Sequence, residues 1–347
     1  MQELIRVCCG TSERLERVLK PCLPAGTRNV TGIGGEDLRG KRLLFTIHVD
    51  KFGPDAAFYE MVRTIRTGSV NLQGTIGGIV VDGESESDTK AMARELALYA
   101  NMAGCTFPGK PLVEATGSLK NFAVRQKRTG ARTLEEAYAK AVEELTGHVL
   151  TYAPERFSRP RVLMVHASDS ATSNTLAIGE RVLAYLGPCC DTEWVSLRNG
   201  TISDCRGCSY TVCAHFAERN SCFYGGSITD DMFPAVLRAD ALLLLCPNYN
   251  DAVGANIMAF INRMTSLTVN DRLAGKRLYA VFVSGYSGGD LVAEQVLGSL
   301  CLNKSFTLPD RFCLMETANN PGEAMAQPGI EARIAALAER MRAELCL

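Results

Sequence analysis

The run Arg161-Val-Leu-Met-Val-His-Ala167 leads directly into Ser168-Asp-Ser-Ala-Thr-Ser-Asn-Thr175. The first part is apolar enough for a buried strand, and the second part is crowded with hydroxyl side chains. A helical pattern begins at Leu176. The stretch therefore predicts a strand, a polar loop and a helix, which is the repeating unit of a parallel α/β sheet.

A second stretch has the same order. Ala241-Leu-Leu-Leu-Leu-Cys246 is fully apolar, and it ends in Pro247-Asn-Tyr-Asn-Asp-Ala-Val-Gly254 before another helical pattern. In an open parallel sheet, ligands bind in the crevice at the carboxyl ends of the strands. Two such loops, one rich in hydroxyls and one carrying Pro and Tyr, predict a nucleotide site.

Length and composition limit the functional classes. The chain has 347 residues, which is enough for two domains, and its net charge of −1 gives no global basic footprint for nucleic acid. It has no apolar run long enough to span a membrane and no secretion-type N-terminus, so we expect a cytoplasmic protein without membrane contact. In such a protein the 14 cysteines are expected as thiols, as metal ligands or as redox groups.

The proline-rich stretch 152–160 predicts a domain boundary. We expect an α/β domain over residues 1–150 and a flavodoxin-like, doubly wound, five-stranded parallel sheet over residues 151–347. The expected strands of the second domain lie near 161–167, 192–196, 241–246, 276–284 and 310–315. The hexapeptides at 38–43 and 273–278 differ at one position, so the first domain is either a degenerate copy of the second or an unrelated α/β domain.

The first polar loop is a candidate phosphate site. It precedes a helix whose free N–H groups and dipole favour an anion, and it lacks both the glycines of a dinucleotide fingerprint and the lysine of a P-loop. Hydroxyls and amides would therefore hold the phosphate. The candidate residues are Ser168, Ser170, Ser173, Asn174 and Thr175. An ordinary polar loop with a helix cap remains an equal alternative on these residues alone.

The second and third loops are candidates for the ring of a flavin. Tyr249 offers a flat aromatic contact, and the turn that begins with Pro247 and Asn248 offers backbone donors. Gly285, in the loop after the fourth expected strand, allows close approach of a ligand to the backbone. The alternative for Tyr249 is that it only covers the end of the sheet.

These features together resemble the NAD(P)H-dependent FMN reductase branch of the flavodoxin-like superfamily, over residues 161 to about 300. The resemblance rests on Ser168–Thr175, Cys205-Arg-Gly-Cys208, Thr229-Asp-Asp-Met232, Pro247-Asn-Tyr249 and Phe260-Ile-Asn-Arg263. Asn248 and Asn262 stand where the family usually has Val and Asp. The resemblance implies that FMN is the cofactor, that NAD(P)H is the electron donor and that the protein forms a homodimer.

The resemblance extends to iron–sulfur flavoproteins, which carry a compact cysteine motif in the same loop. Here the cysteines are Cys205, Cys208, Cys213 and Cys222, with wider later gaps than the family motif. Four thiolates can hold a [4Fe–4S] cluster or a zinc ion. Free or redox-active thiols are the remaining interpretation, and the sequence leaves the three open.

The predicted function is that of a flavin-dependent oxidoreductase in which NAD(P)H reduces FMN and electrons pass to a small acceptor or a protein partner. No catalytic acid or base is expected, because the cofactor carries the hydride step. Two alternatives remain open. One is an electron-transfer protein that binds FMN without a nicotinamide site, and the other is a metal-binding sensor or scaffold.

Overall fold

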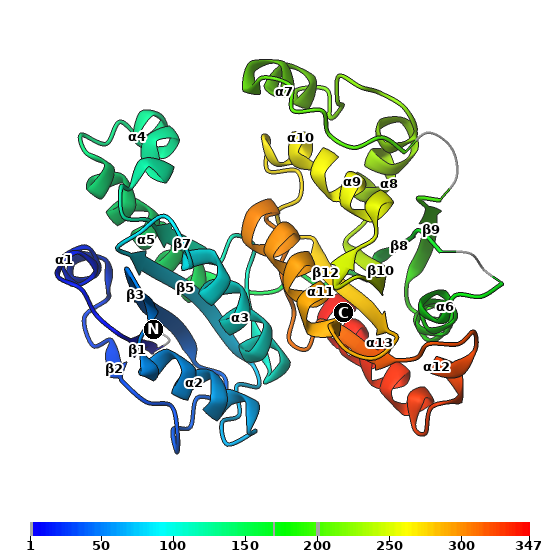
Figure 1. Ribbon diagram of the computed structural model, residues 1–347, viewed down its shortest axis with the longest axis horizontal. Coiled ribbons are helices and arrows are strands. Elements are labelled where there is room, and N and C mark those ends of the chain that lie inside the picture. The colour runs from blue at the N-terminus through cyan, green and yellow to red at the C-terminus, as the bar shows by residue number, and fades with distance from the viewer. Residues whose placement is uncertain (1–2, 169–170, 199–201) are drawn as a thin grey trace. The chain divides into compact units, whose positions relative to one another are not determined.

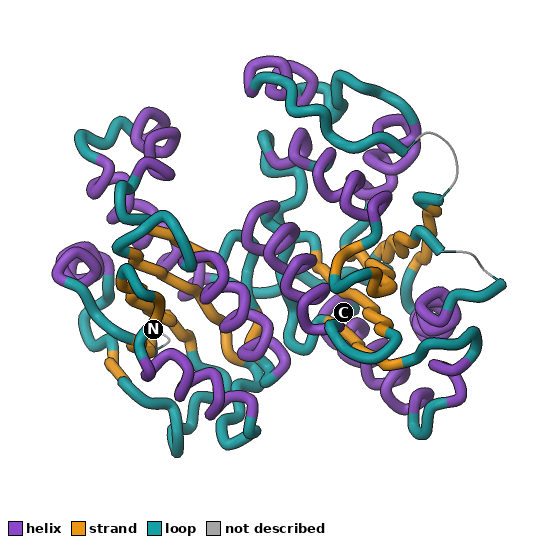
Figure 2. Tube along the Cα trace, viewed as in Figure 1, coloured by secondary structure: helices purple, strands orange, loops and turns teal. Residues whose placement is uncertain are grey.

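The computed structural model describes residues 3–168, 171–198 and 202–347. The chain forms two compact units, Met1–Ala153 and Pro154–Leu347. In each unit the strands of one mainly parallel sheet are flanked by helices (Figures 1 and 2). No helix in the described part of the chain is both long and apolar enough to cross a membrane.

The N-terminal unit alternates strands and helices. Its strands are β1 (Leu4–Cys9), β2 (Arg28–Val30), β3 (Arg42–Asp50), β4 (Gly53–Pro54), β5 (Thr75–Gly83), β6 (Cys105–Thr106) and β7 (Leu112–Ala115). Its helices are α1 (Glu13–Cys22), α2 (Ala56–Arg66), α3 (Thr89–Met102), the 3-10 turn η1 (Lys120–Phe122), α4 (Ala123–Thr129) and α5 (Leu134–Thr151). Thr133 is the N-cap of α5, since its Oγ1 accepts from the Glu136 amide at 3.0 Å.

The C-terminal unit follows the predicted order of elements. Its strands are β8 (Arg161–His166), β9 (Asp191–Ser196), β10 (Ala241–Tyr249), β11 (Ala252–Val253), β12 (Arg277–Ser284) and β13 (Cys313–Thr317). Its helices are α6 (Asn174–Leu186), α7 (Tyr210–Ala217), α8 (Phe233–Arg238), α9 (Ala255–Arg263), α10 (Thr265–Thr268), α11 (Gly289–Leu297), α12 (Glu323–Ala326) and α13 (Ile330–Leu345), with π-helical turns η2 (Ile228–Met232) and η3 (Gly298–Leu302). The last strand begins three residues later than 310, because Arg311 adopts a positive φ of 47° in the preceding turn.

Strand order identifies the topology. The C-terminal sheet runs β13-β12-β10-β8-β9, so its strands in chain order are arranged 2-1-3-4-5. This is the flavodoxin-like doubly wound order, and the expected fold class is confirmed. The N-terminal sheet runs β2-β1-β3-β5, with β6 and β7 both pairing with the far edge of β5, and so has the same order with an interrupted fifth strand.

Corresponding helices cover corresponding faces of the two sheets. In the C-terminal unit α6 and α13 bury Val182, Leu186 and Leu337 against the strand residues Leu243 and Tyr279. In the N-terminal unit α1 and α5 occupy these positions, after the first strand and at the end of the unit. Burial of such an apolar face contributes about 25 cal/mol for each Å² removed from water, so these layers stabilise one side of each sheet.

One glycine lets α6 approach the sheet closely. A Cβ on Gly179 would lie 2.6 Å from Leu245 Cδ1 and 2.8 Å from Met164 Sδ. Because neither neighbour can withdraw from a close-packed core, the helix needs glycine at this point. The contact fixes the position of α6, and therefore of the polar loop at its N-terminal end.

A hairpin extends the third strand beyond its expected end. Residues 247–249 were predicted as loop, but they continue β10 and pair antiparallel with β11, with Asn248 opposite Val253 and Tyr249 opposite Ala252. The two turn residues, Asn250 and Asp251, have φ of 53° and 56°. Two positive φ values are typical of the tight hairpin turns that Asn and Asp favour. The ladder therefore holds Tyr249 in a fixed position at the sheet edge.

Candidate functional site

A single cavity of about 650 Å³ opens at the carboxyl edge of the C-terminal sheet. Its walls come from segments that follow or end all five main strands: residues 167–168 and 172–175 after β8, Arg198 after β9, 247–251 at the end of β10, 285–287 after β12, and 318–319 after β13. Strands 1 and 3 of a flavodoxin-like sheet mark the point where strand order reverses, and ligands bind there. The cavity therefore occupies the position that topology favours.

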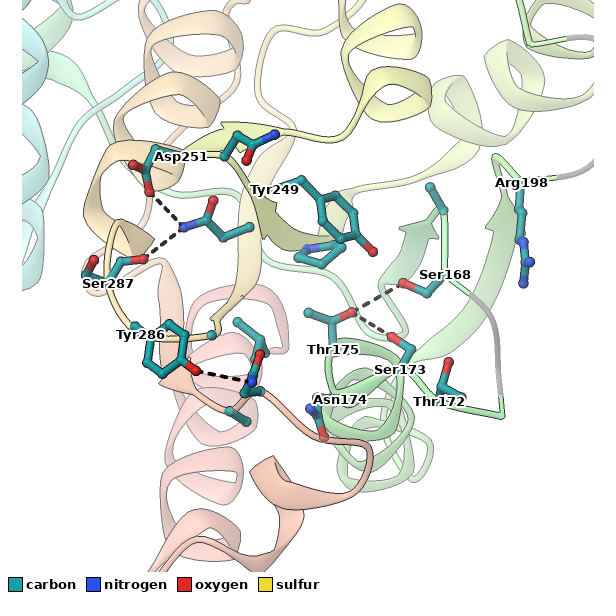
Figure 3. A pocket seen from close by; sticks show the side chains of 18 residues that line it. Ser168, Thr172, Ser173, Asn174, Thr175, Arg198, Tyr249, Asp251, Tyr286 and Ser287 are labelled. Carbon is teal, nitrogen blue, oxygen red and sulfur yellow. Dashed lines mark hydrogen bonds between the residues drawn. The ribbon is translucent and has the colours of Figure 1, made fainter.

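Most of the predicted site residues meet in this cavity. Those that line it are Ser168, Ser173, Asn174, Thr175, Pro247, Asn248, Tyr249 and Gly285. Ser170 lies outside the described residues. In Figure 3 the labelled hydroxyls of Ser168, Ser173 and Thr175 gather on one side of the cavity, and Tyr286 and Ser287 lie on the other.

The hydroxyls form a connected group at the start of α6. The Ser173 and Thr175 hydroxyls are 2.9 Å apart, and those of Ser168 and Thr175 are 3.3 Å apart. Ser173 is also the N-cap of α6, since its Oγ accepts from the Leu176 amide at 3.1 Å. The group thus lies at the positive end of a helix, where an anion is stabilised.

Asn174 is hydrogen-bonded to a different segment from the three hydroxyl residues. Its Nδ2 donates to the Asn320 carbonyl at 2.9 Å, and its Oδ1 accepts from the Ala324 amide at 3.3 Å. Both ends of the amide are therefore engaged with the connection between β13 and α12. The side chain lines the cavity and joins the loop before α6 to this connection.

Asn248 contributes an unpaired acceptor. Its Nδ2 lies within 3.2 Å of Asp251 Oδ1 and Ser284 Oγ and donates to the Ser287 carbonyl at 2.9 Å. Its Oδ1 is buried and has no hydrogen-bond partner among the residues that the structure describes. An unpaired buried acceptor costs free energy unless a ligand N–H donates to it. The ring of a flavin carries such a donor on its pyrimidine edge, so this atom fits the cofactor.

Two aromatic rings lie at the mouth of the cavity. Tyr249 is 63% exposed and Tyr286 is 83% exposed. The Tyr286 hydroxyl accepts from Asn319 Nδ2 at 3.5 Å (Figure 3). Exposed aromatic side chains on a polar cavity provide flat surfaces against which a planar ring can stack.

The wall residues that were not predicted include Arg198, Asp251 and Asn319. Arg198 adds a cationic side chain to the cavity. Each of these residues lies within a few positions of the end of a strand or in the hairpin turn. Inspection of the residues after every strand, including β9 and β13, could have found Arg198 and Asn319.

His166 directly precedes the polar loop between β8 and α6. It is the last residue of β8, is buried, and accepts at Nδ1 from the Ser168 amide at 3.3 Å. Burial lowers the pKa of His166 from its ordinary value of 6.5, so the ring is neutral near pH 7. A neutral ring is the form that can accept this hydrogen bond.

The four cysteines of the second loop gather around α7. Cys205 is exposed and the other three are half-buried. Burial raises the pKa of the Cys213 thiol, and the nearby Cys208, Cys222 and Cys205 raise it further. No three of these sulfurs lie within 4.8 Å of one another among the described residues.

The comparisons with known proteins agree with this geometry. Residues 160–320 match the family model described as NADPH-dependent FMN reductase. No curated protein matches the chain. The resemblance that the sequence suggested is therefore confirmed for the C-terminal unit.

Three solved structures that are similar to this chain each cover about half of it. An NADH:FMN oxidoreductase in its apo form is 13% identical, over 54% of this chain and 90% of that one, with a TM-score of 0.38. An NAD(P)H:quinone oxidoreductase from Methanothermobacter marburgensis is 15% identical, over 53% and 96%, with a TM-score of 0.40. Oxidised flavodoxin 1 from Bacillus cereus is 12% identical, over 53% and 99%, with a TM-score of 0.35.

The family match covers the cavity and all of its walls. The prediction of an FMN-containing oxidoreductase is confirmed at this level. The C-terminal unit accordingly has the flavodoxin-like strand order, and its residues 160–320 match the NADPH-dependent FMN reductase family.

Proposed function

We propose that the cavity at the edge of the C-terminal sheet holds FMN and that NAD(P)H is the electron donor. The observation that carries this proposal is the convergence of five strand ends on one cavity with hydroxyls on one side and aromatic rings at its mouth. When bound, FMN would supply the hydride and electron transfer between NAD(P)H and a small acceptor or protein partner.

The residues divide into a phosphate side and a ring side. Ser168, Ser173 and Thr175 would donate hydroxyl hydrogen bonds to the phosphate, together with the free amides of the first turn of α6. Arg198 would add a positive charge on the same cavity wall. Hydroxyls alone leave the phosphate charge uncompensated, so this arginine is expected to raise affinity.

On the ring side, Asn248 Oδ1 would accept from a ring N–H, and the hairpin would keep it in place. Tyr249 and Gly285 would border the ring, with Pro247 beneath it as part of the cavity wall. The Tyr286 ring would restrict access of water to the bound group. No side chain is required to transfer a proton at this site.

We further propose that Cys205, Cys208, Cys213 and Cys222 are the ligands of an iron–sulfur cluster that relays electrons from the flavin. Four thiolates can hold a [4Fe–4S] cluster, and the iron–sulfur flavoproteins that this chain resembles carry their compact cysteine motif in the same loop. A homodimer remains part of the proposal, on the resemblance alone.

The test begins with absorbance spectra of protein purified without air, before and after addition of NADPH. We expect a flavin spectrum that bleaches on addition of NADPH. Bound flavin that only a partner protein can reduce would indicate an electron carrier. A colourless protein that FMN cannot reconstitute would contradict the proposed cofactor.

A pair of matched variants locates the flavin. Ser173→Ala and Ser12→Ala each remove an N-cap from the helix after the first strand of a unit, since Ser12 Oγ accepts from the Leu15 amide at 3.0 Å. Loss of a hydrogen bond to a charged group costs about 1.5–3 kcal/mol, so Ser173→Ala should weaken FMN binding roughly 10- to 100-fold. Ser12→Ala should leave FMN affinity unchanged. Equal effects of the two variants would place the flavin elsewhere.

A further inference from the structure

Three cysteines outside the flavin cavity lie together at the opposite end of α6. Cys189 and Cys190 form the turn between α6 and β9, and Cys346 directly follows α13. The Sγ atoms of Cys189 and Cys190 are 3.6 Å apart, and those of Cys190 and Cys346 are 4.0 Å apart. All three sulfurs lie within 4.8 Å of one another. Residues 156 positions apart in sequence thus supply one cluster, which we name the trithiol cluster.

The backbone holds the trithiol cluster from two sides. The amides of Cys189 and Cys190 both donate to the Leu186 carbonyl at 2.9 Å, which closes the end of α6. Cys346 forms a parallel bridge with Phe157, and α13 packs against α6 in the same core. The sulfurs therefore belong to segments that are fixed independently of any ion. A site whose ligands are already in place loses little conformational entropy on binding.

The spacing of the sulfurs suits one small ion. Zinc bonds to thiolates at about 2.3 Å, so two ligands of a tetrahedral ion lie about 3.8 Å apart. The separations of 3.6 and 4.0 Å bracket that value. They are far longer than a disulfide bond of about 2.05 Å, and all three cysteines are free thiols.

The chemistry of the donors limits the choice of ion. Among the described residues the group contains only cysteines, with no imidazole or carboxylate. Thiolates select thiophilic ions such as Zn²⁺ over hard ions such as Mg²⁺ and Ca²⁺. Cys190 is buried, while Cys189 and Cys346 are half-buried, which leaves a fourth position accessible to water.

Two arginines interact electrostatically with the trithiol cluster. The guanidinium of Arg159 interacts with Cys189 and Cys190, and that of Arg342 with Cys189 and Cys346, although each is also paired with a carboxylate. Burial and the neighbouring thiols raise the pKa of Cys190 and Cys346 in the metal-free protein. A bound ion must therefore displace the protons of these thiols.

We propose that Cys189, Cys190 and Cys346 bind one thiophilic d¹⁰ dication, for which Zn²⁺ is the physiological candidate. Each thiol that becomes a ligand releases its proton to solvent, so binding needs no oxidant or reductant. The ion joins the turn after α6 to the end of α13. Because these two segments are distant in sequence, its effect is to stabilise the C-terminal unit, and it takes no part in the flavin reaction.

The experiment uses the full chain, reduced and stripped of metal with a chelator that is then removed. Zn²⁺ is added in steps, bound metal is measured by elemental analysis, and accessible cysteines are alkylated and identified by mass spectrometry. We expect Zn²⁺ to protect Cys189, Cys190 and Cys346 together from alkylation. Because this readout identifies the ligands directly, any ion bound at Cys205–Cys222 does not confuse it.

Cys22→Ser is the matched control for Cys189→Ser. Both thiols are half-buried, and each donates to a backbone carbonyl at 3.4 Å, Cys22 to Ala139 and Cys189 to Leu186. Cys189→Ser and Cys346→Ser should each lose one equivalent of bound Zn²⁺ or bind it at least about tenfold more weakly, since even partners outside the ligand set change affinity by about 10- to 100-fold. Cys22→Ser should retain it.

Thermal unfolding gives a second readout. Zn²⁺ should raise the unfolding temperature of the wild type and of Cys22→Ser, but not of Cys346→Ser, because a ligand that binds only the folded state stabilises it. Wild-type protein whose three cysteines alkylate equally with and without Zn²⁺ would overturn the proposal. So would a Cys346→Ser variant that keeps the full metal content and the same thermal shift.

Discussion

The two units share one backbone plan and differ at the carboxyl edge of the sheet. Both sheets have the order 2-1-3-4-5, and both carry a short hairpin after the third strand, with β4 pairing with β3 and β11 with β10. At the C-terminal edge these segments surround an open cavity. At the N-terminal edge Asp82, only 1% exposed, accepts from Arg14 Nε at 2.9 Å and from Ser12 Oγ at 2.9 Å. An ion pair thus occupies the corresponding position.

The difference shows that the strand order alone does not determine whether a unit has a ligand site. Arg14 also donates to the Gly83 and Gly117 carbonyls, so it joins the ends of the fourth and fifth strands from within the chain. Exposed Glu84 and Glu86 follow the same fourth strand and would repel a phosphate. The same strand order therefore supports a ligand site in one unit and an internal ion pair in the other.

We propose that the N-terminal unit is a degenerate copy of the flavodoxin-like unit. The shared strand order and the hairpin after the third strand support this. The hexapeptide similarity does not, because residues 38–43 lead into β3 and residues 273–278 lead into β12, which are the third and the fourth strands. The support for duplication therefore comes from the strand order and the hairpin, and not from the two hexapeptides.

The largest expected effect comes from Asp82→Ala. Removal of one partner from a buried ion pair costs roughly 3 kcal/mol, because the other charge is left without compensation. Hydrogen exchange of β5 peptides should accelerate. Trp194 is the single tryptophan of the chain and lies in the C-terminal unit. Its fluorescence should report unchanged unfolding of that unit. FMN affinity should also be unchanged. Loss of FMN binding would show that the two edges are not independent.

Gly288→Ala should destabilise the C-terminal unit by roughly 2 kcal/mol. The glycine has a φ of 81°, and a Cβ there would lie 1.9 Å from Asp251 Oδ1 on the cavity wall. Gly275→Ala is the control, with a φ of 79° and no atom within 4 Å of the added Cβ. The stability difference between the two variants, measured by urea unfolding, gives the cost of the clash. Equal values would show that the cavity wall adjusts freely.

Asp88→Gly should change stability in the opposite direction. Asp88 precedes α3 as Gly288 precedes α11, has a φ of 68°, and makes no side-chain cap although its position suggested one. Glycine removes the left-handed strain but gains freedom in the unfolded chain, so the net gain is about 0.5 kcal/mol. Urea unfolding followed by hydrogen exchange in α3 measures it. A loss of stability would indicate that the Asp88 side chain has a stabilising role.

The smallest expected effect is on the pH dependence of the C-terminal unit. The pKa of His166 is lowered in the folded state, so the unfolded chain takes up a proton first as pH falls. The stability that the neutral ring contributes is complete above pH 6.5 and is lost as pH falls below that value toward the folded pKa. FMN affinity should weaken only as pH falls through the lowered pKa of the folded state, because a protonated Nδ1 cannot accept from Ser168. His166→Asn should remove this dependence, and an unchanged pH profile would contradict the assignment.

Much of the C-terminal unit could be predicted from local pattern. Apolar runs located four of its five main strands within one residue at their first position. Where prediction failed, the cause was tertiary. Asn248 and Tyr249 were predicted as loop, yet they lie in a strand because they pair with Val253 and Ala252. A hairpin ladder depends on a partner segment, which hydrophobic periodicity does not report.

The sequence by itself determined the strand–loop–helix units, the polar loops at strand ends and the family of the C-terminal unit, because these depend on residue type and spacing within short segments. Only the tertiary structure decided that Arg198 and Asn319 share a cavity with Ser173, and that Cys346 meets Cys189 and Cys190. It also decided that Arg14 and Asp82 fill the corresponding edge of the first unit. These groupings join residues far apart in the chain, and packing of helices on sheets sets which of them meet.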